Sequence, residues 1–148
     1  MDKIDAKILD ILQKDGRISM KTLSQEISMS VPSTTERVKK LEDKKMIEGY
    51  SAIVDPSAVG RPIQAAVMIK LNYELHDKFY DYVSHVDDII EVDEVAGQFF
   101  ALMKICSPDM PRFLKVVYEL RELGGTETYF TIKKVKKIPC RVPETNEE

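Results

Sequence analysis

Residues 19–41 are predicted to form two short helices separated by a tight turn, and this stretch constrains the fold more than any other. In the first helix, the apolar residues Leu23 and Ile27 recur at helical spacing. Ser30 has the cap position of the second helix, and Pro32 lies in its first turn, where a missing N–H costs no hydrogen bond. Two helices joined this closely are typical of a helix-turn-helix.

The second helix is predicted to pack one face and leave the other free, because its apolar residues repeat at helical spacing. Small hydroxyl residues near its start let the backbone approach DNA, and hydroxyls bond either phosphates or base edges. Arg37, placed on the free face, can hold a guanine edge or a phosphate with its planar fork. The predicted DNA-binding residues are Ser30, Ser33, Thr34, Thr35, Arg37 and Lys40. An ordinary solvated surface helix is the alternative for this pattern.

The charge of the chain is unevenly distributed. The 148 residues carry a formal net charge of −3, but residues 1–62 carry a net charge of +1 and residues 63–148 a net charge of −4. A locally basic surface on an acidic protein fits salt-dependent binding to double-stranded DNA and argues against an indiscriminate nucleic-acid coat. With no apolar run long enough for a bilayer and no signal-peptide pattern after Met1, we expect a cytoplasmic protein that does not contact a membrane.

The N-terminal part is predicted to be a winged helix-turn-helix DNA-binding domain over residues 1–54. A first helix begins near Asp2 and ends near Gly16, and its apolar stripe should pack on the two helices that follow. Residues 50–54 have strand-like composition and are expected to form a short wing, with residues 17–19 as a pairing strand. Two prolines and a glycine predict a linker over residues 55–62.

The C-terminal part alternates strand and helix patterns in the order βαββαβ, which predicts an antiparallel four-stranded sheet with two helices on one face. Ser107 and Pro108 are expected to begin the second helix. The expected strands are 63–71, 89–95, 99–106 and 126–135, in an oligomerisation and effector domain over 63–140 followed by a tail over 141–148.

The second face of such a sheet would have no helix to cover it. Met68, Phe99 and Phe100 are expected on that face, where they would expose a patch too apolar for a stable monomer. We therefore expect the chain to form at least a homodimer through paired sheets.

The chain resembles the Lrp/AsnC family, the leucine-responsive or feast/famine transcriptional regulators. The similarity rests on IDAKILDILQKDGRIS at 4–19, SVPSTTERVKKLE at 30–42, IEGYSAIVDPSAVG at 47–60 and AGQFFALMK at 96–104. The resemblance implies an α+β protein, with a winged helix-turn-helix joined to a ferredoxin-like βαββαβ domain of the RAM type. It further implies sequence-specific DNA binding, dimers that assemble to octamers, a small amino-acid effector bound between dimers, and no cofactor.

The effector region departs from the family pattern at one point. Relatives commonly place an aspartate at the fourth position of the glycine turn, where this chain has Phe100, so an effector's ammonium group loses a counter-charge. Phe100 is therefore expected to fill a contact between subunits and to weaken amino-acid binding. By position in the family, the candidate effector-binding residues are Gly97, Gln98, Phe100, Met110, Tyr129, Phe130 and Thr131.

Two other function classes were considered. An enzyme is poorly supported, because the sequence has no nucleophile and base at a useful spacing, no phosphate loop and no metal-ligand cluster. Cys106 and Cys140 are expected to be reduced thiols, and His76 and His85 have no metal-ligand spacing. The remaining alternative is a ligand-binding and assembly module whose N-terminal helices do not read DNA.

Overall fold

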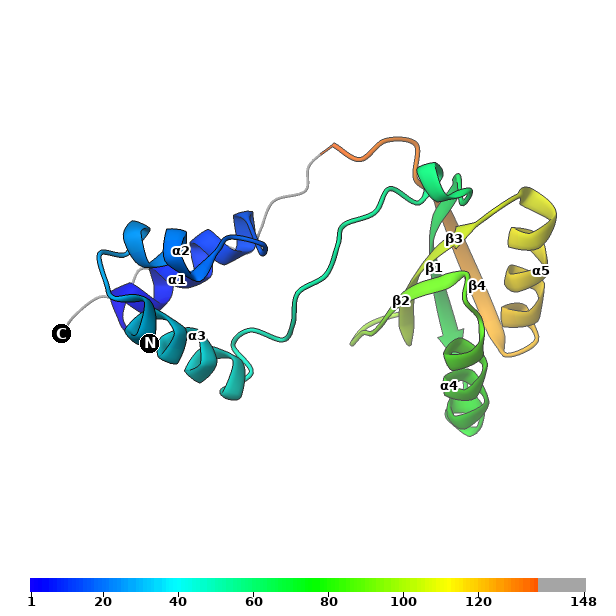
Figure 1. Cartoon of the computed structure of the whole chain (residues 1–148). Coiled ribbons are helices and arrows are strands. Elements are labelled where there is room, and N and C mark those ends of the chain that lie inside the picture. The colour runs from blue at the N-terminus through cyan, green and yellow to red at the C-terminus, as the bar shows by residue number, and fades with distance from the viewer. Residues whose placement is uncertain (136–148) are drawn as a thin grey trace. The chain divides into compact units, whose positions relative to one another are not determined.

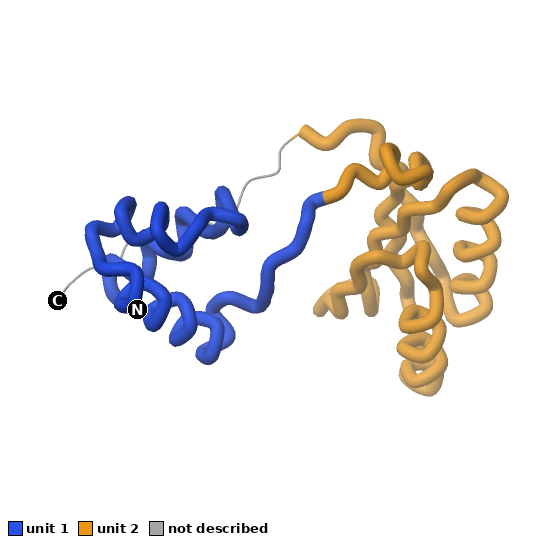
Figure 2. Tube along the Cα trace, viewed as in Figure 1, with its two compact units in different colours: residues 1–53, 136–148 blue, residues 54–135 orange. Residues whose placement is uncertain are grey.

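The computed structural model describes residues 1–135, which form two compact units with a boundary between residues 53 and 54 (Figures 1 and 2). The units are described separately. The predicted domain end at residue 140, the tail over 141–148 and Cys140 lie outside the described residues.

The N-terminal unit consists of three helices, α1 (Lys3–Lys14), α2 (Met20–Glu26) and α3 (Val31–Asp43). Each begins at a polar cap, as the sequence predicts for the last two: the side chains of Asp2, Ser19 and Ser30 each accept a hydrogen bond from a backbone N–H in the first turn. A positive φ of 57° at Ser28 makes the tight turn between α2 and α3. One core holds the three helices together through Ile8, Leu12, Leu23, Ile27, Val38 and Leu41.

The predicted wing strand is wrong for this chain, because residues 48–55 adopt no regular secondary structure. Its proposed partner was only three residues long, and one of them, Ser19, serves instead as the cap of α2. A two-stranded ribbon this short is marginal in water without further packing. The side chain of Ile53 is 79% exposed, so no residue in the described range 1–135 supplies that packing.

The C-terminal unit is a four-stranded antiparallel sheet, as predicted, and its strands lie in the order β2-β3-β1-β4 (Figure 1). The strands are β1 (Ile63–Leu71), β2 (Ile89–Glu94), β3 (Ala101–Ser107) and β4 (Gly124–Phe130). The helices are α4 (His76–His85) and α5 (Met110–Arg121), with short 3-10 turns at Ser57–Val59 and Tyr73–Leu75.

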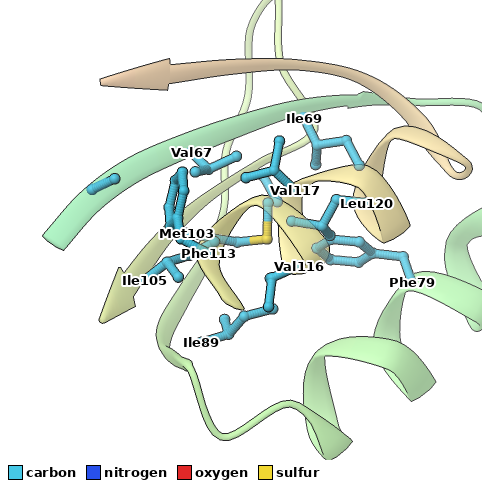
Figure 3. Packing of buried hydrophobic residues seen from close by; sticks show 12 residues of the cluster. Val67, Ile69, Phe79, Ile89, Met103, Ile105, Phe113, Val116, Val117 and Leu120 are labelled. Carbon is cyan, nitrogen blue, oxygen red and sulfur yellow. The ribbon is translucent and has the colours of Figure 1, made fainter. Parts of the chain in front are cut away.

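Both helices pack on the same face of the sheet. Alternate residues of β1, namely Ala65, Val67 and Ile69, are buried in one core with Phe79 of α4 and Phe113 of α5 (Figure 3). Burying a large apolar side chain contributes about 1.5–3 kcal/mol relative to leaving it exposed, so these phenylalanines fix both helices to the sheet.

Phe100 is not on the uncovered face, which corrects the prediction. Its ring lies 4.1 Å from the ring of His76 and 5.6 Å from that of Phe79, so it extends the helix-side core of its own chain. Met68 does lie on the uncovered face, because it alternates with the buried residues of β1. Phe99 stacks near Lys70 of that same face, with the lysine Nζ 5.2 Å from the ring centre.

Two predicted boundaries in the C-terminal unit are also wrong. Helix α5 is capped by Asp109, whose carboxylate accepts from the N–H of Arg112, and not by Ser107. Ser107 ends β3 with a buried hydroxyl that donates to the carboxylate of Asp88. Strand β4 covers 124–130 in place of 126–135, because its pairing with β1 begins at Gly124 opposite Leu71.

Part of the predicted linker belongs to the C-terminal unit. The Arg61 guanidinium donates to the carbonyl oxygens of Cys106 at 3.0 Å and Asp87 at 3.2 Å. It also lies 3.7 Å from the carboxylate of Asp88, which is buried and receives a second ion pair from Arg112 at 3.1 Å. These contacts anchor residue 61 to β3 and to the residues that directly precede β2, so the irregular connection lies before it.

Gly124 is required where β4 passes β1. A Cβ on Gly124 would lie 2.0 Å from the carbonyl oxygen of Lys70, which is backbone and unable to move aside, whereas a Cβ on Gly125 would meet nothing within 4 Å. We predict that Gly124→Ala destabilises the C-terminal unit by about 1–3 kcal/mol, the usual cost of overpacking. Thermal unfolding of full-length protein measures this. Gly125→Ala is the matched control, and equal effects of the two substitutions would contradict the close approach.

Candidate nucleic-acid interface

The exposed side of α3 offers a row of polar side chains suited to a DNA groove. Thr34, Val38 and Leu41 face the core, and their burial directs the opposite side of the helix outward. The residues that remain exposed along this outer side are Pro32, Thr35, Glu36, Lys39, Lys40 and Asp43. The first turn is held by Ser30, whose hydroxyl accepts from the N–H of Ser33 and donates to its hydroxyl at 2.8 Å.

Thr34 cannot contact DNA, which corrects the predicted site. Its side chain is 0% exposed and donates a 2.9 Å hydrogen bond to the carbonyl oxygen of Ser30. Its neighbour Thr35 is exposed and makes the corresponding bond to the carbonyl oxygen of Val31. Adjacent residues lie about 100° apart around a helix, so with Thr34 turned into the core its neighbour Thr35 lies toward the outer side.

Arg37 does not lie on the free face, which is a second correction. It lies on the side of α3 that faces α1, where its Nη1 atom is 2.6 Å from Asp2 and 2.7 Å from Asp5. These bonds to two carboxylates raise the pKa of Arg37 further. The pKa of Asp2 is lowered, first by the backbone N–H of Asp5 and then by the guanidinium. The sequence did not indicate this arrangement, because these acids are more than thirty residues away and also fit a helix start.

Lys40 lies on the exposed side, as predicted, and pairs with Glu36 one turn earlier at 2.7 Å. The hydrogen bond from the lysine lowers the pKa of Glu36. Both side chains are about two-thirds exposed, so solvent screens the pair and a phosphate can replace the glutamate at little cost. Lys39, which the sequence analysis did not select, is also exposed on this side, one turn after Thr35.

A hollow of about 320 Å³ lies between α3 and the start of α1, and we call it the flank hollow. One stripe of α3 supplies its polar wall with Ser33, Arg37, Lys40 and Lys44, spaced at single helical turns. The other lining residues are Met1, Asp5, Met29, Glu36, Leu41 and Met46. A hydroxyl followed by three cations along one helix side is suited to follow a phosphate backbone.

The predicted effector residues separate into two groups within one chain. Gly97 and Gln98 are exposed in the turn between β2 and β3, and Phe100 packs beside that turn. This turn lies at the end of the sheet where Ala101 pairs with Ile69.

The second group lies at the other end of the sheet. Phe130 pairs with Ala65, Tyr129 precedes it, and the N–H of Thr131 donates to Gln64 at 2.8 Å. Met110 follows the end of β3 close to residue 63. The separation of Ala65 from Ile69 along β1 corresponds to about 13 Å, so one chain does not bring the two groups into a single site.

The sheet face opposite the helices has an apolar centre and charged edges. Strand pairing places Ala66, Met68 and Leu102 together at its centre. A shallow depression of about 250 Å³ lies over part of this face, lined by Ala65, Ala66, Glu91, Asp93, Leu102, Met103, Lys104 and Thr131. Among residues 1–135, both helices of this unit pack on the opposite face and do not cover this central stripe.

Other sites were sought among the described residues. No three histidine, cysteine, aspartate or glutamate side chains there form a group that could hold a metal ion. Over the same residues, no helix combines the length and apolarity needed to cross a membrane. Cys106, the cysteine within the described part, is a buried thiol whose pKa is raised by its burial.

Comparisons with known proteins agree across both units. A family model for winged helix-turn-helix DNA-binding matches residues 1–48, and a model for the Lrp/AsnC ligand binding domain matches residues 64–139. The leucine-responsive regulatory proteins of Klebsiella pneumoniae and Escherichia coli K12 are 36% and 35% identical over 144 residues. Each alignment covers 93% of this chain and 88% of the relative.

Solved structures show the same fold. LrpC of Bacillus subtilis is 27% identical with a TM-score of 0.86, covering 92% of this chain and 97% of LrpC. A transcriptional regulator of Neisseria meningitidis, solved with L-Met, is 24% identical with a TM-score of 0.87, covering 97% and 96% of the two chains.

The placement of the two threonines generates a testable difference. Thr34→Val removes a buried hydrogen bond and should lower the free energy of unfolding by about 1 kcal/mol, while leaving DNA affinity unchanged in the folded protein. Thr35→Val makes the same chemical change on the exposed side, and should weaken DNA binding with little loss of stability. Chemical unfolding and fluorescence anisotropy with labelled DNA measure the two effects. Weaker DNA binding by Thr34→Val than by Thr35→Val would contradict the orientation of α3.

Proposed function

Since the chain belongs to the Lrp/AsnC family of transcriptional regulators, we propose that it reads specific double-stranded DNA sites with the exposed side of α3. The observation that supports this most directly is the outward row of Thr35, Lys39 and Lys40 beside a capped, hydroxyl-rich helix start. A helix presented in this way fits the major groove with its N-terminal half against the base edges.

The exposed residues divide into two roles by their angle around α3. Thr35 and Lys39 lie near the middle of the outer side, so we assign them to base edges, where lysine donates to guanine and a hydroxyl bonds either partner. Ser33 and Lys40 lie toward the flank hollow, so we assign them to phosphates, and Ser30 bonds a phosphate at the helix start. Thr34 is excluded by its burial.

These roles predict different outcomes for two neighbouring lysines. Lys39→Ala should relax the preference for one base position, with a loss of about 1–3 kcal/mol on the preferred site only. Lys40→Ala should weaken all DNA sequences alike and reduce the salt slope of binding by about one. The measurement is anisotropy on a site selected from random DNA, titrated with salt.

Lys14→Ala, at the end of α1, is the charge-matched control for both lysines and should change neither quantity. If both substitutions on α3 left DNA binding intact, the chain would instead be an assembly module whose helices do not read DNA. Its relatives are named as regulatory proteins, and we propose no catalytic activity. Because its partner is DNA, we place it in the cytoplasm.

We propose that two copies pair through the uncovered faces of their sheets to form a homodimer. Ala66, Met68 and Leu102 form an apolar stripe there, bordered by Glu91, Asp93 and Lys104 that can arrange the rim by charge. Apolar centres with polar rims are the usual anatomy of protein interfaces. Assembly of such dimers to an octamer remains part of this proposal.

The proposed effector site also depends on assembly of copies. The two groups of candidate residues lie at opposite ends of one sheet, so a site using both needs a second copy to supply the other group. We propose that a small amino acid binds between copies; the Neisseria relative was solved as a complex with an amino acid, L-Met. Gln98 is exposed and supplies a polar side chain, whereas Phe100 is held against α4 and supplies no charge.

Charge placed on the uncovered face should separate the copies. We predict that Met68→Glu converts the full-length dimer to monomer by burying an uncompensated carboxylate in the interface. Multi-angle light scattering measures the mass. Lys78→Glu puts the same side chain on the exposed surface of α4, and should leave the dimer intact. An unchanged dimer for Met68→Glu, with the variant folded by circular dichroism, would refute pairing through this face.

A further inference from the structure

Among the ion pairs described in residues 1–135, Arg37 is the cation of the N-terminal unit that pairs with two carboxylates. One of its nitrogen atoms, Nη1, is bonded at 2.6 Å to Asp2 Oδ2 and at 2.7 Å to Asp5 Oδ1. Both carboxylates come from the first turn of α1, where they also form the capping box of that helix. The guanidinium side chain keeps 28% of its surface exposed, so it is not sealed in the core.

The position of this cluster matters because Arg37 lines the flank hollow together with Ser33, Lys40 and Lys44. A phosphate that followed this stripe would meet one hydroxyl and three cations. With its two carboxylates in place, however, the cluster around Arg37 has a net charge of −1. That corner of the hollow therefore opposes a phosphate in the arrangement seen here.

We propose that Asp2 and Asp5 form an electrostatic latch on Arg37, which competes with DNA phosphate for the guanidinium and sets how strongly the protein holds DNA. The proposal rests on the proposed function, because it assigns a regulatory element to the same helix. The bond to Asp2 is the more readily exchanged of the two, because 51% of the Asp2 side chain is exposed and an exposed ion pair has a small net stability that a phosphate can replace. The side chain of Asp5 is 21% exposed and its bond to Arg37 is part-buried. Arginine bonds a phosphate with two parallel N–H groups, whereas here it offers Nη1 alone to both acids.

The latch can be opened without removing the helix cap. Asparagine caps helices as well as aspartate, so Asp2→Asn keeps the side-chain oxygen that accepts from the N–H of Asp5. Asp5→Asn likewise keeps an oxygen facing the N–H of Asp2. The double variant D2N/D5N therefore removes two charges and retains the bonds that start α1, and its thermal midpoint verifies that the unit stays folded.

The test is DNA binding by the full-length chain over a series of salt concentrations. We expect D2N/D5N to bind about fivefold more tightly at low salt, with a salt slope steeper by about one because a further phosphate contact forms. In the Arg37→Ala background, D2N/D5N should give a clearly smaller gain and no change in slope. The control D10N/D15N removes the same number of charges, from Asp10 in α1 and from its C-cap residue Asp15, neither of which lines the flank hollow, and should leave affinity within about twofold.

Three outcomes would overturn the latch: no gain from D2N/D5N, an equal gain in the Arg37→Ala background, or an equal gain from D10N/D15N. The second and third would indicate general charge repulsion. Random-sequence DNA of the same length is titrated in parallel, because competition for phosphate predicts the same gain on any sequence. If the wild-type protein bound a selected site no more tightly than random DNA, that result would contradict only the proposed function. The gain in affinity of D2N/D5N for random DNA would still test the latch.

Discussion

The alternation of side chains along β1 is the constraint on which the C-terminal unit depends. Ala65, Val67 and Ile69 point to the helices and are buried, so the residues between them must point the other way. Both helices are needed on one face to bury Phe79 and Phe113, which leaves none for the second face. The uncovered face, through which we propose that two copies pair, therefore follows from the same period of two that builds the core.

Local signals in the sequence predicted the elements, because caps and periodicity act over a few residues. Ser30 and Pro32 correctly marked the start of α3, and the four antiparallel strands followed from the βαββαβ pattern. The errors occurred where a distant partner decides the outcome. Arg37 was placed on the free face because the position of Asp2 beside it depends on how α1 packs. Thr34 and Thr35 were not distinguished, since either could begin the apolar face until the core was known.

Helix α5 begins two residues later than predicted because two residues could have served as its cap. Ser107 and Pro108 had the sequence signature of a helix start, but the hydroxyl of Ser107 is taken by the buried carboxylate of Asp88. Asp88 also forms an ion pair with Arg112 and lies near Arg61. This one buried carboxylate therefore links the ends of two strands, a helix and the segment that leads into β1. The predicted effector site was incomplete for a related reason, because its residues lie at two ends of the sheet and only assembly could unite them.

Residues 48–55, which form no regular secondary structure, tether the three-helix unit to the rest of the chain. Eight residues can extend over at most about 26–29 Å, and Arg61 fixes where the anchored chain begins. In a dimer, two such tethers would make the second half-site contact an intramolecular event, with an effective concentration in the millimolar range for short flexible linkers.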